Sequence, residues 1–382
     1  MTKGAKRLSI ILLSTVALSF QLSSSFGVLK QNSSTENRIQ SSYGVNKDDR
    51  TGIRDEEFIG DTSKYIPDSG QTSQPHFPDP CIGNLYPTPA EGKMVRANVL
   101  GIEFDMYVYS HESVRDIVSD SIKASGSWEM RETQMLMNLV SCDSADECAK
   151  RVFLDVGANI GWYSLTAANL GYWVISFEPF RSNLGLMCSS SRRLDEMKAK
   201  RMTVFNVGLD FKPRHCELFQ KRSRNIGDTH SVCDGASRSQ FVDKGYASLG
   251  WMNTTTLDIA LEDGHFNHVG HVDVMKVDVE GFEYSVMEGG NQFFQSRFAP
   301  KYIFMELVSS LMGDAGGLND RGESRLESVL MKLTNYGYEL EHFANSGAST
   351  AENDHHLLLQ SSPLREVRQF IDGKNILFKK IF

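Results

Sequence analysis

The chain has 382 residues, of which 40% are hydrophobic and 23% are charged, a composition typical of globular proteins. This length suits one large domain or two small ones. The formal net charge of −8 disfavours nucleic acid as the main partner, because binding to phosphates requires a positively charged surface.

The N-terminus has the pattern of a targeting segment. Residues 8–29 carry no charge, and basic residues precede them. The most apolar part, 8–20, has the length of a signal-peptide core, and the small residues Ser23–Ser25 suit a cleavage site. Alternatively, the whole of 8–29 could span a bilayer as a signal anchor, since a membrane helix needs about 20 apolar residues.

Both alternatives predict entry into the secretory pathway. We favour the anchor because the segment stays apolar through Phe26, Val28 and Leu29. The basic residues would then hold the N-terminal end in the cytoplasm and place the rest of the chain in the lumen of the endoplasmic reticulum or Golgi. A cleaved segment would give a secreted protein, and a cytosolic chain with an apolar N-terminus is the remaining alternative.

Residues 31–90 are rich in Ser, Thr, Asn, Asp, Gly and Pro, which predicts a disordered stem or linker without a core of its own. The folded domain is therefore expected at 91–382, with its core at about 150–310. Two Asn-x-Ser/Thr motifs, at Asn32 and Asn253, could carry glycans in the lumen.

The sequence at the start of the folded domain predicts a cap ahead of the first core strand. Residues Met94–Tyr109 alternate like a hairpin with its turn at Leu100-Gly101. Glu129–Val140 then has helical spacing. We expect these pieces to cover an edge of the sheet and to help close a cofactor site.

The segment Arg151–Phe180 has the pattern of a strand, a glycine turn, a helix and a second strand. Asp155 ends the first strand and Glu178 ends the second. The turn between strand and helix consists of Gly157, Ala158, Asn159, Ile160 and Gly161. Because ligands of open α/β sheets bind at the carboxyl ends of the strands, we expect Asp155, the turn and Glu178 to converge.

This arrangement predicts a nucleoside cofactor. Glu178 lies 23 positions after Asp155, close to the spacing of a carboxylate that accepts hydrogen bonds from ribose hydroxyls. The turn lacks the third glycine of a dinucleotide fingerprint and the lysine of a phosphate-binding loop. These absences favour a cofactor without a pyrophosphate, such as S-adenosylmethionine (SAM). The alternative is a structural turn that binds nothing.

The middle of the chain adds a third core strand, Met202–Leu209, whose residues Asn206 and Val207 are expected near an adenine ring. His215–Gln220 predicts a further strand. Lys221–Ser248 is polar and irregular, so we interpret it as a long surface loop that selects the substrate. The residues that follow predict a short helix up to Leu261.

Three histidines, His265, His268 and His271, have a regular spacing that could indicate a metal site. Gly264 and Gly270 argue against the helix that would place them on one face. We therefore expect no metal site here. The six cysteines also lack zinc spacing, and in an oxidising lumen they could form up to three disulfides of undetermined connectivity, with Cys188 as a candidate buried thiol.

A fourth strand, Val272–Val279, places Asp278 at its carboxyl end. Asp278 could hydrogen-bond the amino group of a cofactor or act as general base for an acceptor hydroxyl. Glu280 is an alternative base, and Glu283 is interpreted as a solvated residue in the first turn of a helix. Lys276 lies on the same side of the strand as Asp278 and could pair with a carboxylate.

The last predicted elements complete an α/β sheet. Lys301–Val308 predicts the fifth strand, with Glu306 near its end in position to contact substrate or, with Asp278, a divalent ion. A loop at 316–322, a helix at Arg325–Tyr336 and two strands at His355–Gln360 and Asn375–Phe382 follow. The pattern predicts a doubly wound, mostly parallel sheet with an antiparallel C-terminal strand.

Three blocks, FLDVGANIG from Phe153, SFEP from Ser176 and DVMKVDVEGFE from Asp273, resemble the signature blocks of the FkbM-type SAM-dependent methyltransferase family. The resemblance implies a Rossmann-like class I methyltransferase fold, SAM as cofactor, and O-methylation of a hydroxyl. With the N-terminal segment, it implies a glycan or another hydroxylated product of the secretory pathway as substrate.

The resemblance and the strand ends together select the candidate site residues. The predicted cofactor-binding residues are Asp155, Gly157, Ala158, Asn159, Gly161, Glu178, Asn206, Val207 and Asp278. The predicted catalytic residues are Asp278, Glu280 and Glu306. The predicted partners are a hydroxylated small molecule or glycan and, if the N-terminal segment is uncleaved, a membrane.

Two other functions remain as alternatives. An NAD-dependent oxidoreductase predicts a G-x-G-x-x-G turn, which the sequence lacks. A non-catalytic lumenal binding protein on a methyltransferase fold predicts loss of Asp155, Gly157, Glu178 or Asp278, yet all four are present. The acceptor, the identity of the base and the oligomeric state do not follow from the sequence.

Overall fold

The computed structural model describes residues 79–81, 86–90, 92–110, 116–221, 229–233, 238–308, 324–344 and 373–381. All of them belong to one compact unit, Ser69–Phe382. The predicted targeting segment, the motif at Asn32, the loop at 316–322 and the strand at His355–Gln360 lie outside the described residues. No helix in the described part of the chain is long and apolar enough to cross a bilayer.

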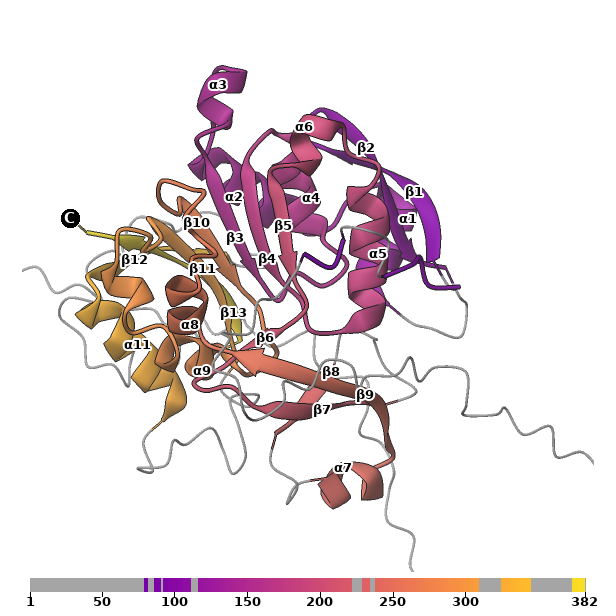
Figure 1. Ribbon diagram of the computed structural model, residues 1–382, viewed down its shortest axis with the longest axis vertical. Helices are drawn as coiled ribbons and strands as arrows, with labels where there is room; N and C mark the ends of the chain where they lie inside the picture. The colour runs from indigo at the N-terminus through magenta and orange to yellow at the C-terminus, as the bar shows by residue number, and fades with distance from the viewer. Residues whose placement is uncertain are drawn as a thin grey trace, which may run out of the picture. The chain divides into compact units, whose positions relative to one another are not determined.

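A seven-stranded sheet forms the centre of this unit (Figure 1). Its spatial order is β12 (Tyr338–Ala344), β13 (Lys374–Lys380), β11 (Tyr302–Leu307), β10 (Val274–Val277), β3 (Val152–Val156), β4 (Trp173–Phe177) and β5 (Met202–Phe205). All neighbours pair in parallel except β13, which pairs antiparallel with β11 and β12. The chain order reverses at β3, as in doubly wound sheets, which confirms the predicted fold class.

Both faces of the sheet are covered, which explains why its strands read as continuous apolar runs. Every residue of β3 is buried. Phe153 faces a core with helices α4 (Trp162–Asn169) and α5 (Arg181–Ser191), and Leu154 faces the opposite core. That opposite core contains α8 (Leu257–Glu262), α9 (Glu283–Glu288), η4 (Phe293–Gln295) and α11 (Arg325–Asn335).

The predicted hairpin is confirmed. Strands β1 (Gly92–Val99) and β2 (Ile102–Tyr109) pair antiparallel, and Leu100 and Gly101 both have positive φ, as a tight two-residue hairpin turn requires. The cap also contains α1 (Ile117–Ser125), α2 (Met130–Leu139) and the short α3 (Ala145–Cys148). It was expected to cover a sheet edge, but β2 instead packs on α5, where the amide of Tyr107 donates to the Ser190 hydroxyl.

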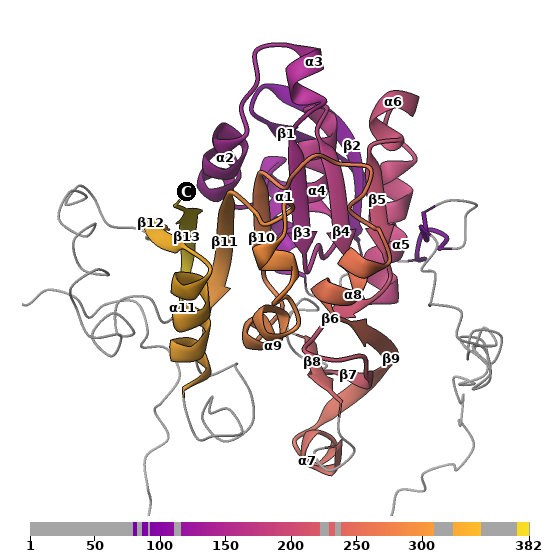
Figure 2. The same ribbon diagram turned by 60° about the vertical axis from the view of Figure 1, so that its left-hand side comes forward.

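The region after β5 departs from the sequence interpretation. The third core strand ends at Phe205, and the next residues pass through β6 (Gly208–Leu209) into a second sheet of order β6-β9-β7-β8. The other strands are β7 (His215–Lys221), β8 (Thr229–Val232) and β9 (Tyr246–Thr255). This sheet lies beyond the carboxyl ends of the parallel strands (Figure 2).

The prediction of a surface loop at 221–248 is therefore wrong. This stretch contains β8, helix α7 (Arg238–Asp243) and the start of β9. The strand β8 was not recognised because it is only partly buried and carries polar residues. The stretch packs against β7 through an aromatic cluster of Phe219, Phe241 and Tyr246. At the C-terminus, α11 and β13 are confirmed, whereas β12 was not predicted.

The end of the predicted stem belongs to the folded domain. Cys81 forms a disulfide with Cys188 on α5, so the interpretation of Cys188 as a buried thiol is wrong. Pro87 packs so closely on α5 that a Cβ at Gly185 would lie 2.9 Å from its carbonyl oxygen. The remaining cysteines pair as Cys142–Cys148 and Cys216–Cys233, so the sequence has no free thiol.

Candidate cofactor site

The glycine turn between β3 and α4 packs directly on the end of β10. Gly157 has φ +81°, and a Cβ there would lie 1.9 Å from the carbonyl oxygen of Asp278. Gly161 has φ +89° and begins α4, with no room for a side chain against Met187. Glycine is therefore required at both positions, and the turn and Asp278 lie side by side as predicted.

Glu178 holds the turn through its carboxylate. One oxygen accepts a hydrogen bond from the Asn159 amide at 2.7 Å, and the other accepts from the Phe180 amide at 2.8 Å. The oxygen that accepts from Phe180 also accepts from the Asn183 side chain at 3.5 Å, whereas the oxygen that accepts from Asn159 retains a second lone pair for a ribose hydroxyl. Burial raises the pKa of Glu178 to about 7, against the stabilising effect of these amides on the charged form.

A cavity opens between this turn and the second sheet. The sequence predicted six of its lining residues: Gly157, Asn159, Glu178, Val207, Asp278 and Glu280. Phe177, Val207 and Leu209 supply apolar walls, as an adenine ring requires. The second sheet adds Leu218, Thr229, Ser231 and Met252, none of which was predicted. Thr229 and Ser231 lie in the stretch that was interpreted as a loop.

The other predicted cofactor residues support the cavity without lining it. Asp155 lies inside β3, fully buried, and accepts a hydrogen bond from Ser164 at 2.6 Å. The side chain of Asn206 donates to the carbonyls of Glu178 and Pro179 and accepts from the Tyr86 hydroxyl. Ala158 is buried, and Gly161 begins α4; neither they nor Asp155 and Asn206 belong to the cavity wall.

Acidic side chains gather where β10 and β11 end. Lys276, buried within the sheet, pairs with Asp278 at 3.0 Å, as predicted. Glu306, on β11, lies close enough to Asp278 for the two negative charges to interact, but it does not line the cavity. Burial, followed by the negative charges of Asp278 and Glu129, raises the pKa of Glu306 to about 7. A carboxylate with this pKa can take up a proton near neutral pH.

Glu129, which precedes α2 in the cap, was not predicted to join this group. Its carboxylate accepts a hydrogen bond from the Tyr163 hydroxyl at 2.7 Å. Its backbone has φ +40°, an uncommon conformation for a residue with a side chain. The sequence gives no signal for this placement, because a single glutamate before a helix resembles an ordinary surface residue. The cap therefore contributes charge to the acidic group.

Glu283 is not the solvated helix residue that the sequence indicated. Only 3% of its surface is exposed, and one carboxylate oxygen accepts from the amides of Val279 and Gly281. Burial raises its pKa to about 7. It thus holds the loop after Asp278 in place, at the cost of a buried charge above neutral pH.

We expect Glu283→Gln to stabilise the protein at pH 8 by about 1–2 kcal/mol. In the folded protein the pKa of Glu283 lies above the ordinary value of 4.5. The protonated acid therefore contributes fully to the free energy of unfolding below pH 4.5, and this contribution is lost as the pH rises through about 7. Glutamine keeps the acceptor for both amides and removes the charge. Thermal unfolding of both proteins at pH 8 and pH 5 checks this prediction. The extra stability of Glu283→Gln should vanish at pH 5, and a variant less stable than the wild type at pH 8 would contradict the prediction.

The three histidines do not converge. His265 packs on Phe205, His268 packs on Trp173, and His271 lies 3.0 Å from a carboxylate oxygen of Asp273. They therefore occupy three different environments rather than one ligand set.

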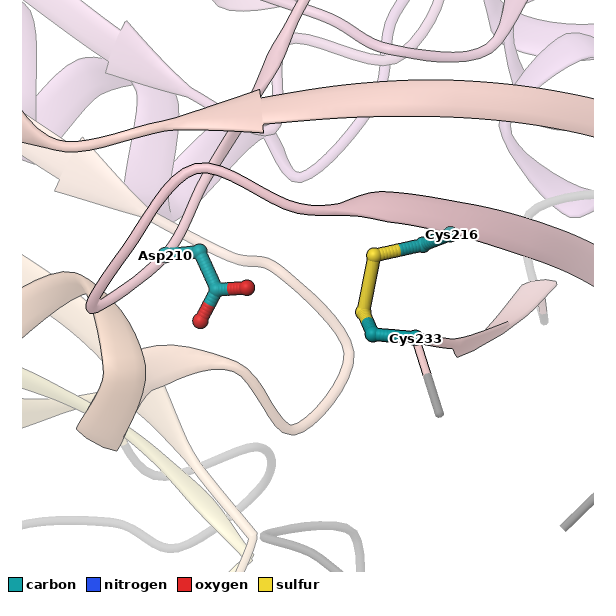
Figure 3. A group of neighbouring side chains, drawn as sticks. All are labelled: Asp210, Cys216 and Cys233. Carbon is teal, nitrogen blue, oxygen red and sulfur yellow. A yellow bond between two sulfur atoms is a disulfide. The ribbon is translucent and has the colours of Figure 1, made fainter. Parts of the chain in front are cut away.

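One group of potential metal ligands occurs in the described part of the chain: Asp210, Cys216 and Cys233 (Figure 3). The two cysteines form a disulfide, so neither offers a thiolate. The carboxylate of Asp210 pairs with Arg214 at 2.6 Å. These contacts assign the group a structural role, which is to anchor β7 and β8 beside the end of β6.

Residues 155–340 match the sequence model of the methyltransferase FkbM domain. The chain carries an FkbM methyltransferase domain. The match begins at Asp155 and includes the glycine turn, Glu178, Asp278 and Glu306. The match confirms the predicted family and with it SAM as the cofactor, and the strand order agrees with the class I methyltransferase fold. No curated protein matches the sequence.

Among solved structures, the chain is similar to a precorrin-6y C5,15-methyltransferase from Geobacter metallireducens. The identity is 10%, the match covers 70% of this chain and 98% of that one, and the TM-score is 0.32. A magnesium protoporphyrin IX methyltransferase from Synechocystis with bound SAM gives 10% identity, coverages of 70% and 85%, and a TM-score of 0.34. A putative SAM-dependent methyltransferase from Streptococcus mutans gives 10% identity, coverages of 76% and 56%, and a TM-score of 0.35. At these TM-scores, the fold assignment depends on the strand order and the family match.

The residues of the FkbM domain fit SAM. Gly157 allows the turn to pack against the backbone of Asp278, so that both line the cavity, and Glu178 presents buried carboxylate oxygens to it. Apolar side chains line the wall beside it. A buried acceptor pair and an apolar wall match a nucleoside better than a pyrophosphate, for which backbone amides and positive charge would be needed.

Proposed function

We propose that this protein transfers a methyl group from SAM to a hydroxyl of a glycan or another hydroxylated product of the secretory pathway. The observation that carries the proposal is the Asp278–Glu306 carboxylate pair. Asp278 lines the cofactor cavity, and burial together with the negative charge of Asp278 raises the pKa of the nearby Glu306 to about 7. A base of this kind suits a hydroxyl acceptor, which is a poor nucleophile until it loses its proton.

When bound, SAM supplies an electrophilic methyl group on a sulfonium centre. The residues of the chain orient the acceptor and move its proton. Asp278 would orient the hydroxyl, because Lys276 holds its carboxylate in place from within the sheet. Glu306 would take the proton directly from the hydroxyl, since burial and its acidic neighbours make it more basic than an ordinary glutamate. Glu280, the third predicted catalytic residue, lines the cavity and has a positive φ of 51°.

The proposed location in the secretory pathway is supported by the cysteines. All six cysteines of the sequence pair in disulfides, which persist in oxidising compartments and are rare in the cytosol. The uncharged segment at 8–29 would deliver the chain there as a signal anchor or a signal peptide. A catalytic domain in the lumen would meet glycans directly, and an anchored form would hold it at the membrane.

The test is to incubate the full chain with SAM carrying a labelled methyl group and a panel of glycans. Label that resists mild base and appears on a sugar hydroxyl in the product would support the proposal, because an ether survives conditions that cleave a methyl ester. Label on nitrogen or carbon would overturn the O-methyl assignment. SAM binding without turnover on the panel would favour the alternative of a non-catalytic binding protein.

A further inference from the structure

One face of the second sheet exposes a large aromatic side chain. Trp251, on β9, an inner strand of this sheet, has 53% of its surface exposed. Its neighbour Met252 is buried and lines the cofactor cavity. Because side chains alternate along a strand, Trp251 points to the opposite, outer face. An exposed indole on the face of a sheet offers a flat, largely apolar surface with a polar N–H for contact with a ligand.

His215 and Asn253 continue this outer face. His215 on β7 lies directly opposite Asn253 in the strand register, and its Nδ1 lies 2.9 Å from the Asn253 side-chain oxygen. The His215 ring also stacks on Trp251, with ring centres 4.8 Å apart and planes only 6° apart. Trp251 and Asn253 are two positions apart on β9, so they share one face.

Asn253 begins the motif Asn253-Thr254-Thr255, an acceptor for N-linked glycans. Its side chain is exposed in the folded domain, whereas Thr254 and Thr255 are buried. The contact with His215 uses the oxygen of the amide. The amide nitrogen, to which a glycan would be linked, is therefore not required for this contact.

We propose that Asn253 carries an N-linked glycan whose first sugars lie on the Trp251–His215 platform. The apolar face of a pyranose ring packs well on an aromatic ring, and the sugar at Asn253 would lie beside Trp251 on the same face of the strand. The glycan would cover the exposed indole and leave the cofactor cavity, on the other face, open. This inference rests on the proposed location in the secretory pathway.

The experiment expresses the full chain in eukaryotic cells, both unaltered and with an added cleavable signal sequence ahead of it. An amidase that removes N-linked glycans converts each glycosylated asparagine to aspartate, and mass spectrometry then locates the change. We expect conversion at Asn253, and we expect Asn253→Gln to remove one glycan from the protein, with Asn32→Gln as the matched control at the other motif. Protease protection reports whether the unaltered chain enters the lumen.

The platform is tested by heat stability before and after deglycosylation. We expect the glycan to raise the melting temperature of the unaltered protein, and we expect Trp251→Ala to abolish this difference while Asn253 remains glycosylated. An unmodified Asn253 in a chain that the added signal sequence has brought into the lumen would overturn the site, and an unchanged difference in Trp251→Ala would overturn the platform. Failure of only the unaltered chain to enter the lumen would overturn the proposed location instead.

Discussion

Replacement of Glu306 by glutamine is expected to lower kcat for methyl transfer by about 10²–10⁴-fold, the contribution of a positioned general base. Glutamine has nearly the shape of glutamate and keeps a hydrogen-bonding group beside Asp278, but it cannot take up a proton. Glu306 lies outside the cofactor cavity, so the dissociation constant for SAM should change little. Steady-state kinetics and a SAM titration on the same preparation separate the two effects.

The pH dependence gives this prediction a second readout. Because the pKa of Glu306 is raised to about 7, the wild-type rate should rise as the pH increases through 7 and the base ionises. Glu306→Gln should lose this limb of the profile. Glu341→Gln is the matched control, since Glu341 pairs with Lys379 on the antiparallel edge of the sheet, away from the site. Retention of wild-type kcat by Glu306→Gln would remove Glu306 from the mechanism.

Replacement of Glu178 by alanine is expected to raise the dissociation constant for SAM by about 10²–10⁴-fold. The carboxylate offers two oxygens at the cavity wall, and each hydrogen bond to a charged group contributes about 1.5–3 kcal/mol. Calorimetric titration measures the loss. The wild-type affinity should also fall as the pH drops below about 7, because protonation of Glu178 replaces an acceptor with a donor.

Glu178 also holds the amides of Asn159 and Phe180, so its replacement could loosen the turn. Thermal unfolding without cofactor distinguishes this effect from lost contacts with SAM. Glu196→Ala is the matched control, because Glu196 forms an exposed ion pair with Lys200 on α6 (Glu196–Ala199) that contributes little to stability. An unchanged SAM affinity in a well-folded Glu178→Ala protein would show that this carboxylate does not contact the cofactor.

The parallel core could be predicted from the sequence because its signals are local. A buried parallel strand is a continuous apolar run, and a glycine turn followed by a helix marks where it ends. For this reason the strand Trp173–Phe177 was predicted correctly, with Glu178 directly after it. Asp155 was placed one residue too close to the strand end, because β3 continues to Val156 and buries the carboxylate inside the sheet.

The parts that escaped prediction depend on contacts between distant segments. The second sheet is tied together by Cys216–Cys233 and by aromatic packing across β7, α7 and β9, none of which has a regular spacing in the sequence. Glu129 affects the acidic group only through the tertiary fold, which brings its carboxylate to the Tyr163 hydroxyl on α4. Glu283 follows an ordinary helix-start pattern, and only the three-dimensional packing shows that it is buried.

Calorimetric titration of the purified full chain with SAM, and separately with NAD⁺, tests the central claim that this FkbM domain holds a nucleoside cofactor at Glu178 and the Gly157 turn. We predict saturable one-to-one binding of SAM and no binding of NAD⁺ at the same concentrations, because the turn lacks the third glycine of a dinucleotide fingerprint. Binding of NAD⁺, or no binding of SAM by a protein that unfolds cooperatively on heating, would contradict the account.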